Sequence, residues 1–408
     1  LEPSYRIFYN RDEYIDIQRD LLQNAAAFES YEKGSGDKLK EYLCQAKYKY
    51  DIALNEFLYK DYNSLLDLLN RRMIFDGMKL QVFNKLDNYV KKFFKNHKLR
   101  KIVEFNTVFL GCSPYKTPAL YSLMSHVDIT QGVTYPKGGI FSFVSALYSL
   151  AEEVGVRFRF NETVTSLDVH DSHITSIITN KSSYKPDVVL SSIDYQHTEE
   201  KLLEPKYQTY TSSYWEKRVL APTAFLIYLG LNKKLTQLQH HSLFLSEQWD
   251  EHFKDVFDTP EWPDNPSIYI GCPSRNDPSV APEGCENIFI LVPVAPGLED
   301  TDAVRNTFLD KIITILEYIA EESIADAIVV KKIKAHRDFI TQHKMYKGSS
   351  MGLAHTLFQT AYFRPKRKSK KVDNLYYTGQ YTHPGIGMPM VVISGELAAQ
   401  RIIKDYKK

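Results

Sequence analysis

This sequence of 408 residues has few cysteines, almost no net charge and no long apolar runs. The cysteines are widely spaced and form no C-x-x-C pair, which indicates neither a zinc site nor a disulfide framework. We expect them to be small buried side chains in a reducing compartment (Cys44, Cys112, Cys272 and Cys285). Lysine and arginine number 51 against 50 for aspartate and glutamate, and this net charge of +1 argues against a protein that coats nucleic acid. The longest apolar runs, 224–231 and 288–295, fall well short of the roughly 18 residues that a membrane-spanning helix needs.

Aromatic residues are abundant instead, with 28 tyrosines and 22 phenylalanines. Such rings bury large apolar areas, and tyrosine also suits surfaces that are partly hydrated and partly apolar. The spacing of apolar residues predicts an α/β protein of mixed character, with a hairpin at 5–17 and a mainly helical part from 20 to 105. Further helices are predicted at 141–154, 302–322 and 390–404, and strands at 156–161, 164–170, 174–179, 187–192, 223–230, 267–272, 288–294 and 375–378.

The most informative stretch covers residues 373–399. A strand is predicted to end at Gly379, and Gly385 and Gly387 keep the backbone of the following loop bare. Pro389 stands where a helix begins, because its fixed φ suits the first helical turn. A bare loop that leads into a helix N-terminus directs free N–H groups at an electron-rich ligand, such as the edge of a reduced flavin. A strand–turn–helix that uses glycine only for turn geometry is the alternative.

The same stretch resembles the C-terminal flavin motif of bacterial carotenoid desaturases, the group of the phytoene and diapophytoene desaturases. Further stretches resemble this family along nearly the whole chain, at 109–123, 134–140, 277–284 and 292–298. The resemblance implies an FAD-binding Rossmann-like domain of the glutathione-reductase/amine-oxidase type, a mixed-sheet substrate domain and a helical membrane-facing part. It also implies an enzyme of carotenoid biosynthesis that dehydrogenates a linear polyene such as phytoene, a lipid-dissolved carotene.

The sequence departs from this family at its start. The family opens with a strand and a G-x-G-x-x-G turn that receives the FAD diphosphate, and this chain has no such unit. Gly34-Ser-Gly36 lacks the third glycine and indicates a loop before a helix. We therefore expect the first βαβ unit to belong before Leu1, the chain to be an N-terminally incomplete copy, and FAD to be retained weakly by residues 1–408 alone. The expected parts are a helical substrate- and membrane-facing region (1–130), the middle of the FAD-binding domain (131–205), a substrate-binding domain (206–360) and the C-terminal flavin motif with its helix (361–408).

The resemblance also assigns candidate site residues. The cofactor-binding ones are Val164, whose family counterpart meets the adenine ring through its backbone, and Gly379, Gln380, Pro384, Gly385, Gly387, Met388, Pro389 and Met390 of the loop. The catalytic candidates are Arg100 and His383. Arg100 matches a Leu-Arg pair before the family's flavin-facing helix and would assist charge that develops at the flavin; the alternative is a surface arginine. His383 lies within the flavin loop, and the alternative is a histidine that only fixes a turn.

Two basic runs bear on membrane contact. Phe93 and Phe94 are surrounded on one predicted helix by basic residues (Lys91, Lys92, Lys95, Lys98, Arg100 and Lys101). This pattern is typical of a helix in an anionic membrane interface, or of a solvated face. The second run, 364–371, indicates a solvated loop. Together with a lipid-dissolved substrate, the two basic runs predict a cytoplasmic protein that is peripheral on the inner face of the cytoplasmic membrane. No nucleic-acid partner is expected.

Several functions stay open beside phytoene desaturation. They are diapophytoene (C30) desaturation, carotenoid isomerisation, carotenoid oxidation, and isoprenoid binding by an inactive fragment. The sequence leaves open the substrate length, the number of double bonds introduced, the terminal electron acceptor and the oligomeric state.

Overall fold

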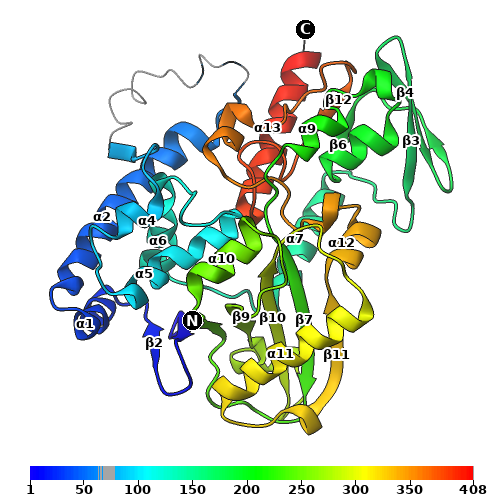
Figure 1. Cartoon of the computed structure of the whole chain (residues 1–408). Helices are drawn as coiled ribbons and strands as arrows, with labels where there is room; N and C mark the ends of the chain where they lie inside the picture. The colour runs from blue at the N-terminus through cyan, green and yellow to red at the C-terminus, as the bar shows by residue number, and fades with distance from the viewer. Residues whose placement is uncertain (63, 65–66, 68–78, 408) are drawn as a thin grey trace.

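The computed structural model describes residues 1–62, 64, 67 and 79–407, and Figure 1 shows how their helices and strands are arranged. The largest sheet has seven strands in the order β11-β7-β10-β9-β8-β1-β2. They are β1 (Tyr5–Phe8), β2 (Tyr14–Ile17), β7 (Thr223–Leu231), β8 (His241–Phe244), β9 (Ile268–Gly271), β10 (Glu286–Val294) and β11 (Ile328–Lys334). The predicted N-terminal hairpin is confirmed, because β1 and β2 pair antiparallel. β1 also pairs parallel with β8, so the hairpin extends a sheet built mainly from residues 223–334.

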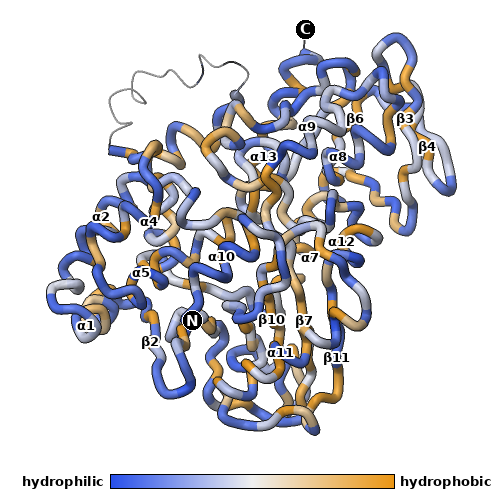
Figure 2. Tube along the Cα trace, viewed as in Figure 1, coloured by the Kyte–Doolittle hydropathy of each residue, from blue (hydrophilic) through white to orange (hydrophobic). Residues whose placement is uncertain are grey.

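β7 and β10 form the hydrophobic centre of this sheet. They pair antiparallel along their whole length, and alternate residues such as Ile227 and Ile290 are fully buried, as the period of a strand requires. The predicted helix at 302–322 is confirmed as α11 (Asp302–Ala320), which packs Phe308 and Ile312 against the same core. Figure 2 shows hydrophobic residues concentrated along β7 and β10, with α11 lying across them.

The helical region contains α1 (Leu21–Tyr31), α2 (Ser35–Ile52), α4 (Leu86–Val90) and α5 (His97–Glu104). The expected single basic helix around Phe93 and Phe94 is wrong, because α4 ends at Val90 and α5 begins at His97. Both phenylalanines are buried and pack edge-on against Tyr42, with ring centroids 5.3 and 5.9 Å away. This aromatic pair therefore belongs to the core and is not available to a bilayer.

A parallel pair of short strands, β6 (Val189–Ser191) and β12 (Leu375–Tyr377), carries the C-terminal segment. α13 (Met388–Tyr406) follows β12 and has Pro389 in its first turn, as predicted. A separate antiparallel sheet consists of β3 (Val164–His170), β4 (His173–Thr179) and β5 (Ser183–Tyr184). β3 and β12 share one hydrophobic core with Trp215 and Leu353. The mixed α/β class is confirmed, and the division into four segments stays a prediction.

Two expected strands differ from the structure. Residues 156–161 follow α7 (Ile140–Glu153) without a ladder partner within the described part of the chain, and the strand expected at 187–192 is reduced to β6, in which Leu190 is 42% exposed. Apolar alternation predicts a strand, but a strand forms only where a neighbour accepts its hydrogen bonds. α7 packs on the 156–161 segment through Tyr148 and Phe158, and it has no buried residue. Their remaining apolar side chains form an open face.

The other α-helices of the described residues are short: α6 (Leu123–Ser125), α8 (Tyr195–His197), α9 (Ser212–Glu216), α10 (Trp249–Phe257) and α12 (His336–His343). Cys112 and Cys272 are buried as expected, whereas Cys44 is exposed because it lies on the solvent side of α2, and Cys285 is half-buried. In the described ranges, no helix combines the length and apolarity that crossing a bilayer requires. The same ranges hold no group of three or more metal-ligating side chains.

Candidate functional site

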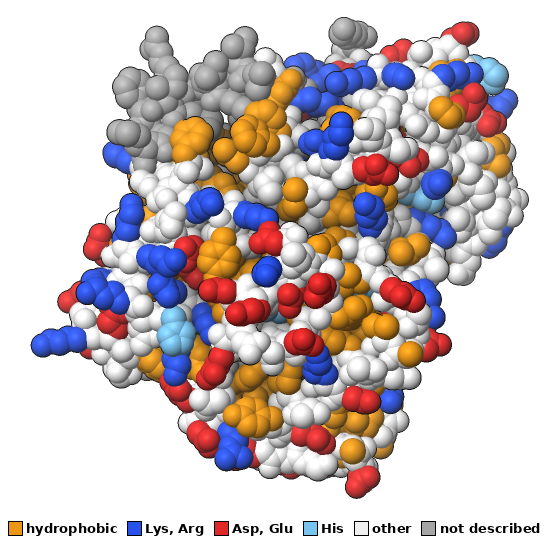
Figure 3. Space-filling view, in the orientation of Figure 1, with side chains coloured by type: hydrophobic (Ala, Val, Ile, Leu, Met, Phe, Trp, Pro, Cys, Tyr) orange, Lys and Arg blue, Asp and Glu red, His pale blue; other side chains and the backbone are white. Residues whose placement is uncertain are grey.

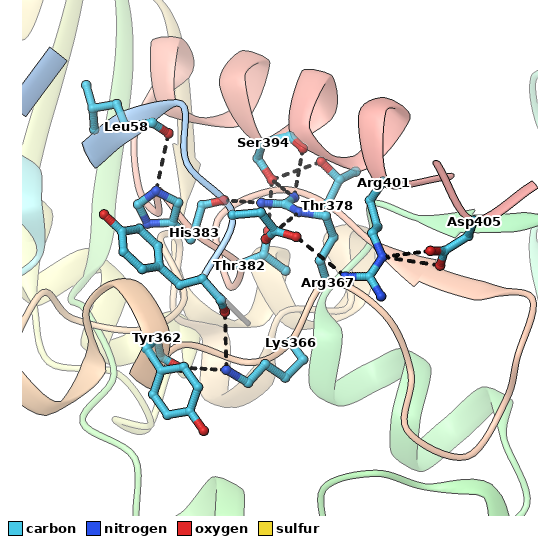
Figure 4. A network of polar contacts seen from close by, with 12 residues as sticks. Leu58, Tyr362, Lys366, Arg367, Thr378, Thr382, His383, Ser394, Arg401 and Asp405 are labelled. Atoms are coloured by element: carbon cyan, nitrogen blue, oxygen red, sulfur yellow. Dashed lines mark hydrogen bonds and ion pairs between the residues drawn. The ribbon is translucent and has the colours of Figure 1, made fainter. Parts of the chain in front are cut away.

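The loop between β12 and α13 is tied to the helix by one serine. Ser394 Oγ accepts a hydrogen bond of 3.0 Å from the Gly379 N–H and lies 2.8 Å from Thr382 Oγ1 and 3.0 Å from Thr378 Oγ1. The Thr382 N–H in turn donates to the Gly379 carbonyl at 3.1 Å. Figure 4 shows Ser394, Thr378 and Thr382 converging beside Arg367. The turn predicted at Gly379 is therefore held in one conformation by side chains from both of its flanks.

The two glycines before α13 have different surroundings. Gly385 is buried with φ at +122°, and a Cβ there would lie 2.8 Å from Arg364 Cζ and closer still to His355 Nε2. Gly387 is exposed with φ at +113°, and a Cβ there would meet only Met390 Cγ, at 3.8 Å. Gly385 therefore permits close packing within the protein, whereas Gly387 leaves its backbone bare on the open side of the loop.

The start of α13 fits one edge of a flavin ring. Gly387 is the N-cap and offers no side chain to the amides of the first turn. Free N–H groups at a helix N-terminus attract electron-rich groups. Gly387, Met388 and Pro389 are exposed, and Met390 is half-buried, so this end of the loop is open to a large ligand.

The other predicted cofactor-binding residues lie deeper or farther away. Gln380 is half-buried, with its Nε2 3.6 Å from Met345 Sδ, and the Pro384 carbonyl lies 3.3 Å from the buried His355 Nε2. Val164 opens β3 opposite Thr179 and is 37% exposed. The structure thus brings Gly387, Met388, Pro389 and Met390 to the open side, and their contact with a cofactor stays a prediction, as it does for Val164.

Two buried arginines hold the loop, and the expectation of a solvated run at 364–371 is wrong for both. Arg364 donates a hydrogen bond of 2.8 Å to the Gln380 carbonyl, and Arg367 donates one of the same length to the His383 carbonyl. They are only 2% and 5% exposed, and burial lowers the pKa of Arg364 to about 10. The sequence pattern missed them because a run of cations looks alike whether it is solvated or folded beneath a loop.

His383 connects the loop to an earlier segment. Its Nε2 lies 3.0 Å from the Phe57 carbonyl and 3.2 Å from the Leu58 carbonyl, so this nitrogen carries the proton and donates to both. Figure 4 shows the contact with Leu58. Burial lowers the pKa of His383 to about 4, so the ring is neutral at pH 7. These contacts are those of a residue that fixes the loop, and a catalytic role for His383 stays a prediction.

Arg100 is not brought to this loop. It is half-buried on α5, and among the described residues it has no hydrogen bond to the loop. Its charge acts instead on a buried carboxyl: burial raises the pKa of Glu104 to about 8, and Arg100 opposes part of that shift. The catalytic role expected for Arg100 stays a prediction.

Comparison with known proteins identifies the family of this chain. Residues 3–403 match the family described as flavin containing amine oxidoreductase. The chain is 40% identical over 406 residues to a carotenoid 3,4-desaturase of Haloarcula japonica, and the alignment covers 99% of this chain and 82% of the relative. It is 29% identical to a zeta-carotene-forming phytoene desaturase of Myxococcus xanthus (98% and 78% covered) and 28% identical to a 4,4'-diapophytoene desaturase of Staphylococcus aureus (100% and 84%).

Solved structures show the same fold at low identity. An oxidoreductase from Methanosarcina mazei superimposes with a TM-score of 0.60 at 12% identity, covering 97% of this chain and 80% of that one. A variant of putrescine oxidase gives 0.55 at 10% identity, covering 98% and 81%. The matched span reaches from the N-terminal hairpin through the glycine loop to α13. The chain therefore belongs to the flavin-containing amine oxidoreductase family and, within it, to the carotenoid desaturases.

Proposed function

We propose that this protein is an FAD-dependent enzyme of carotenoid biosynthesis that introduces carbon–carbon double bonds into a linear carotene. The observation that carries the proposal is the bare, uncapped start of α13 at Gly387. It occurs in a chain that is 40% identical, over nearly its whole length, to a carotenoid 3,4-desaturase.

The loop residues have separate tasks in this proposal. The backbone at Gly387 and the first-turn N–H groups of Met388 and Met390 would hold the ring edge. A bound flavin supplies the acceptor for the hydrogen removed from the substrate. Arg364 and Arg367 keep two positive charges behind the loop, which favours negative charge on its open side. Ser394 and the two arginines hold the loop rigid, so that these groups are positioned before the substrate arrives. Arg100 and His383 are retained as catalytic candidates for substitution.

A C40 substrate is favoured over a C30 one. The identity is 40% to the carotenoid 3,4-desaturase and 28% to the diapophytoene desaturase. A hydrocarbon offers no polar group to recognise, so binding must come from apolar contact, and the substrate must be taken from lipid. We therefore propose a peripheral position at the inner face of the cytoplasmic membrane. C30 desaturation, isomerisation, oxidation and inactive isoprenoid binding are the alternatives.

The test combines a cofactor readout with a product readout. The chain is purified, supplied with excess FAD, and incubated with lipid vesicles that carry phytoene, an already conjugated acyclic C40 carotene, or diapophytoene. New double bonds lengthen the conjugated system, so a C40 desaturase shifts the product absorbance to longer wavelength with one or both C40 substrates. A shift with diapophytoene alone would identify a C30 enzyme. Bound flavin with no shift and no new isomer, at matched protein and lipid, would overturn the proposal.

A further inference from the structure

A strongly basic cavity lies behind the glycine loop. Its volume is about 260 Å³, and its cationic lining consists of Arg364, Lys366, Arg367, Lys368, Lys370 and Arg401. Among the residues that the structure describes, Asp61 is the one carboxylate that lines it. Figure 4 shows how Lys366, Arg367 and Arg401 surround this space, between the loop that holds His383 and the end of α13. The buried arginines of the run at 364–371 thus line a concave site, whereas Lys370 and Lys371 are exposed, as expected for a solvated loop.

The carboxylates nearby do not balance this charge. Lys368 and Arg401 share Asp405, at 2.9 and 3.1 Å. Arg367 and Arg401 lie 3.5 and 3.8 Å from Asp61. Within the described residues, no carboxylate lies within ion-pair distance of the three other cations, Arg364, Lys366 and Lys370.

Burial makes the charges of Arg364 and Lys366 costly, whereas Lys370 is exposed at the rim. Arg364 is almost fully buried, and its Nε has no hydrogen-bond partner. Burial, and then the neighbouring charge of Lys370, lowers the pKa of Lys366 to about 8. A buried cation is favourable only when a counter-charge or hydrogen bonds replace its lost water. Carbonyl groups accept hydrogen bonds from Arg364 and Lys366, but they bring no negative charge. The uncompensated positive charge of the lining therefore favours an anion, and a phosphate offers several acceptor oxygens to guanidinium and ammonium donors.

An exposed aromatic cluster borders the cavity. The Lys366 Nζ lies 3.4 Å from the centre of the Tyr362 ring and donates to the Tyr362 carbonyl at 3.0 Å. The ring of Phe363 is next, at 5.7 Å, and Phe358 lies 5.7 Å beyond it. Phe358 is 70% exposed and Phe363 37%. Figure 3 shows Lys and Arg side chains gathered at the upper edge of the molecule beside hydrophobic ones.

We propose that this cavity binds the phosphate of an anionic lipid headgroup, with Phe358 and Phe363 inserted at the boundary between headgroups and acyl chains. A free phosphate would need only the cations, whereas exposed rings beside them match the two-part surface of a membrane. Arg364 and Arg367 also hold the carbonyls of Gln380 and His383. A headgroup in the cavity would therefore seat the glycine loop at the lipid that dissolves an apolar substrate.

The test uses vesicles without carotenoid, so its outcome does not depend on the proposed desaturation. Binding of the full chain is measured by flotation with phosphatidylcholine vesicles, with and without phosphatidylglycerol. The expected result is binding that needs phosphatidylglycerol and weakens as salt rises. The double variant Lys366→Ala/Lys370→Ala should weaken it roughly tenfold or more. Its control, Lys331→Ala/Lys332→Ala, removes the same charge from exposed positions on β11 and should leave binding unchanged.

Two further measurements distinguish a lipid phosphate from free inorganic phosphate as the ligand. Phe358→Ser should weaken vesicle binding, while Leu22→Ser, at a position 69% exposed on α1, should not. Inorganic phosphate should compete poorly with the vesicles. Equal losses in both lysine pairs would show that overall charge, not this cavity, attracts the membrane. Full displacement by inorganic phosphate, with Phe358→Ser unchanged, would identify a free-phosphate site. Either result would overturn the proposal.

Discussion

Lys49 places an amine inside the aromatic core of the helical region. Its Nζ donates to the Ala119 carbonyl at 3.0 Å and to Ser122 Oγ at 2.8 Å, and it lies 3.7 Å from the centre of the Tyr89 ring. The residue is 1% exposed, and burial lowers its pKa to about 7. The neutral amine loses less hydration on burial than the ammonium does, so the fold favours the neutral form.

The stability of the protein should therefore rise with pH where Lys49 titrates. The folded pKa is about 7, and an unfolded lysine keeps its proton until about 10.4. Between these values the unfolded state binds more protons, so the free energy of unfolding increases with pH. Lys49→Met should remove this increase and stabilise the fold near neutral pH by up to about 4 kcal/mol. Urea unfolding at neutral and at alkaline pH measures it, and Lys47→Met, at a solvated position on α2, should keep the wild-type slope. An unchanged slope in the Lys49 variant would contradict the argument.

Gly385 and Gly387 should respond differently to the same substitution. At Gly385 a Cβ collides with Arg364 and His355, so Gly385→Ala should lower the free energy of unfolding by about 3 kcal/mol through strain and overpacking. At Gly387 the space is open and only the positive φ resists, so Gly387→Ala should destabilise by about 1 kcal/mol. Flavin bound per protein, measured by absorbance with excess FAD, should nevertheless fall in Gly387→Ala. Equal flavin content in Gly387→Ala and wild type would remove Gly387 from the site.

At the scale of elements, the sequence predicts those helices and strands whose apolar pattern lies within one continuous segment. β10 is one continuous apolar run from Ile288 onward, α11 keeps one apolar stripe, and both formed as expected. The basic residues from Lys91 to Lys101 were expected on one helix because Phe93 and Phe94 continue the apolar spacing across a turn. The local sign of that turn is Asn96, whose side chain caps α5 by accepting from the Lys98 N–H. The strand predicted at 156–161 did not form, because an apolar alternation does not reveal whether a neighbouring strand is there to accept its hydrogen bonds.

The candidate site was predictable only where it is local. Strand, glycine loop and Pro389 helix start follow one another along the chain, so their order could be inferred from sequence. The contacts that hold them are not local: Ser394 binds Gly379 from two turns into α13, and Arg364 reaches back across the loop. No spacing rule brings these residues together, and the structure was needed to find them.

Arg364 should be irreplaceable by lysine in this loop. Its planar guanidinium donates to the Gln380 carbonyl at 2.8 Å and to the Leu353 carbonyl at 3.1 Å, which come from two different segments. An ammonium group lacks this fork, so Arg364→Lys should leave one carbonyl without its donor and lower the free energy of unfolding by about 1–3 kcal/mol. Amide hydrogen exchange at 379–387 should accelerate. Arg337→Lys, at a half-exposed position paired with Asp302, should change neither quantity. Wild-type exchange rates in Arg364→Lys would show that the guanidinium does not hold the loop.

At the scale of the whole molecule, the glycine loop lies where three parts of the fold meet. Gly111, which follows the helical region, packs against Ala221 from the segment before β7 and against Ile386 of the loop. His355 lies between the Leu110 and Pro384 carbonyls, at 3.0 and 3.3 Å. Many of the abundant aromatic rings fill the cores around this junction, such as the stacked Tyr195 and Tyr377 (ring centroids 3.7 Å apart). Much of the aromatic surplus that suggested a substrate surface therefore stabilises the scaffold of the loop.

One face of this scaffold is apolar and uncovered. α7 exposes Phe141 by 76% and Leu147 by 44%, and the segment that follows it exposes Phe160 by 67%. Contiguous apolar patches of this kind mark contact surfaces or promote association. The purified 408-residue chain should therefore bind a hydrophobic dye and self-associate as its concentration rises.

Phe141→Lys combined with Leu147→Lys should suppress both effects. Neither side chain is buried, so the free energy of unfolding should change by no more than about 0.5 kcal/mol while the face becomes charged. The control is Leu22→Lys, which adds a charge at an exposed apolar residue on α1, at the far end of the helical region from α7 (Figure 1). Dye fluorescence and sedimentation velocity measure the two effects, and urea unfolding measures stability. If the double variant unfolds at a lower urea concentration and keeps its dye binding, then α7 contributes to a core in solution, and the open face assigned to it does not exist.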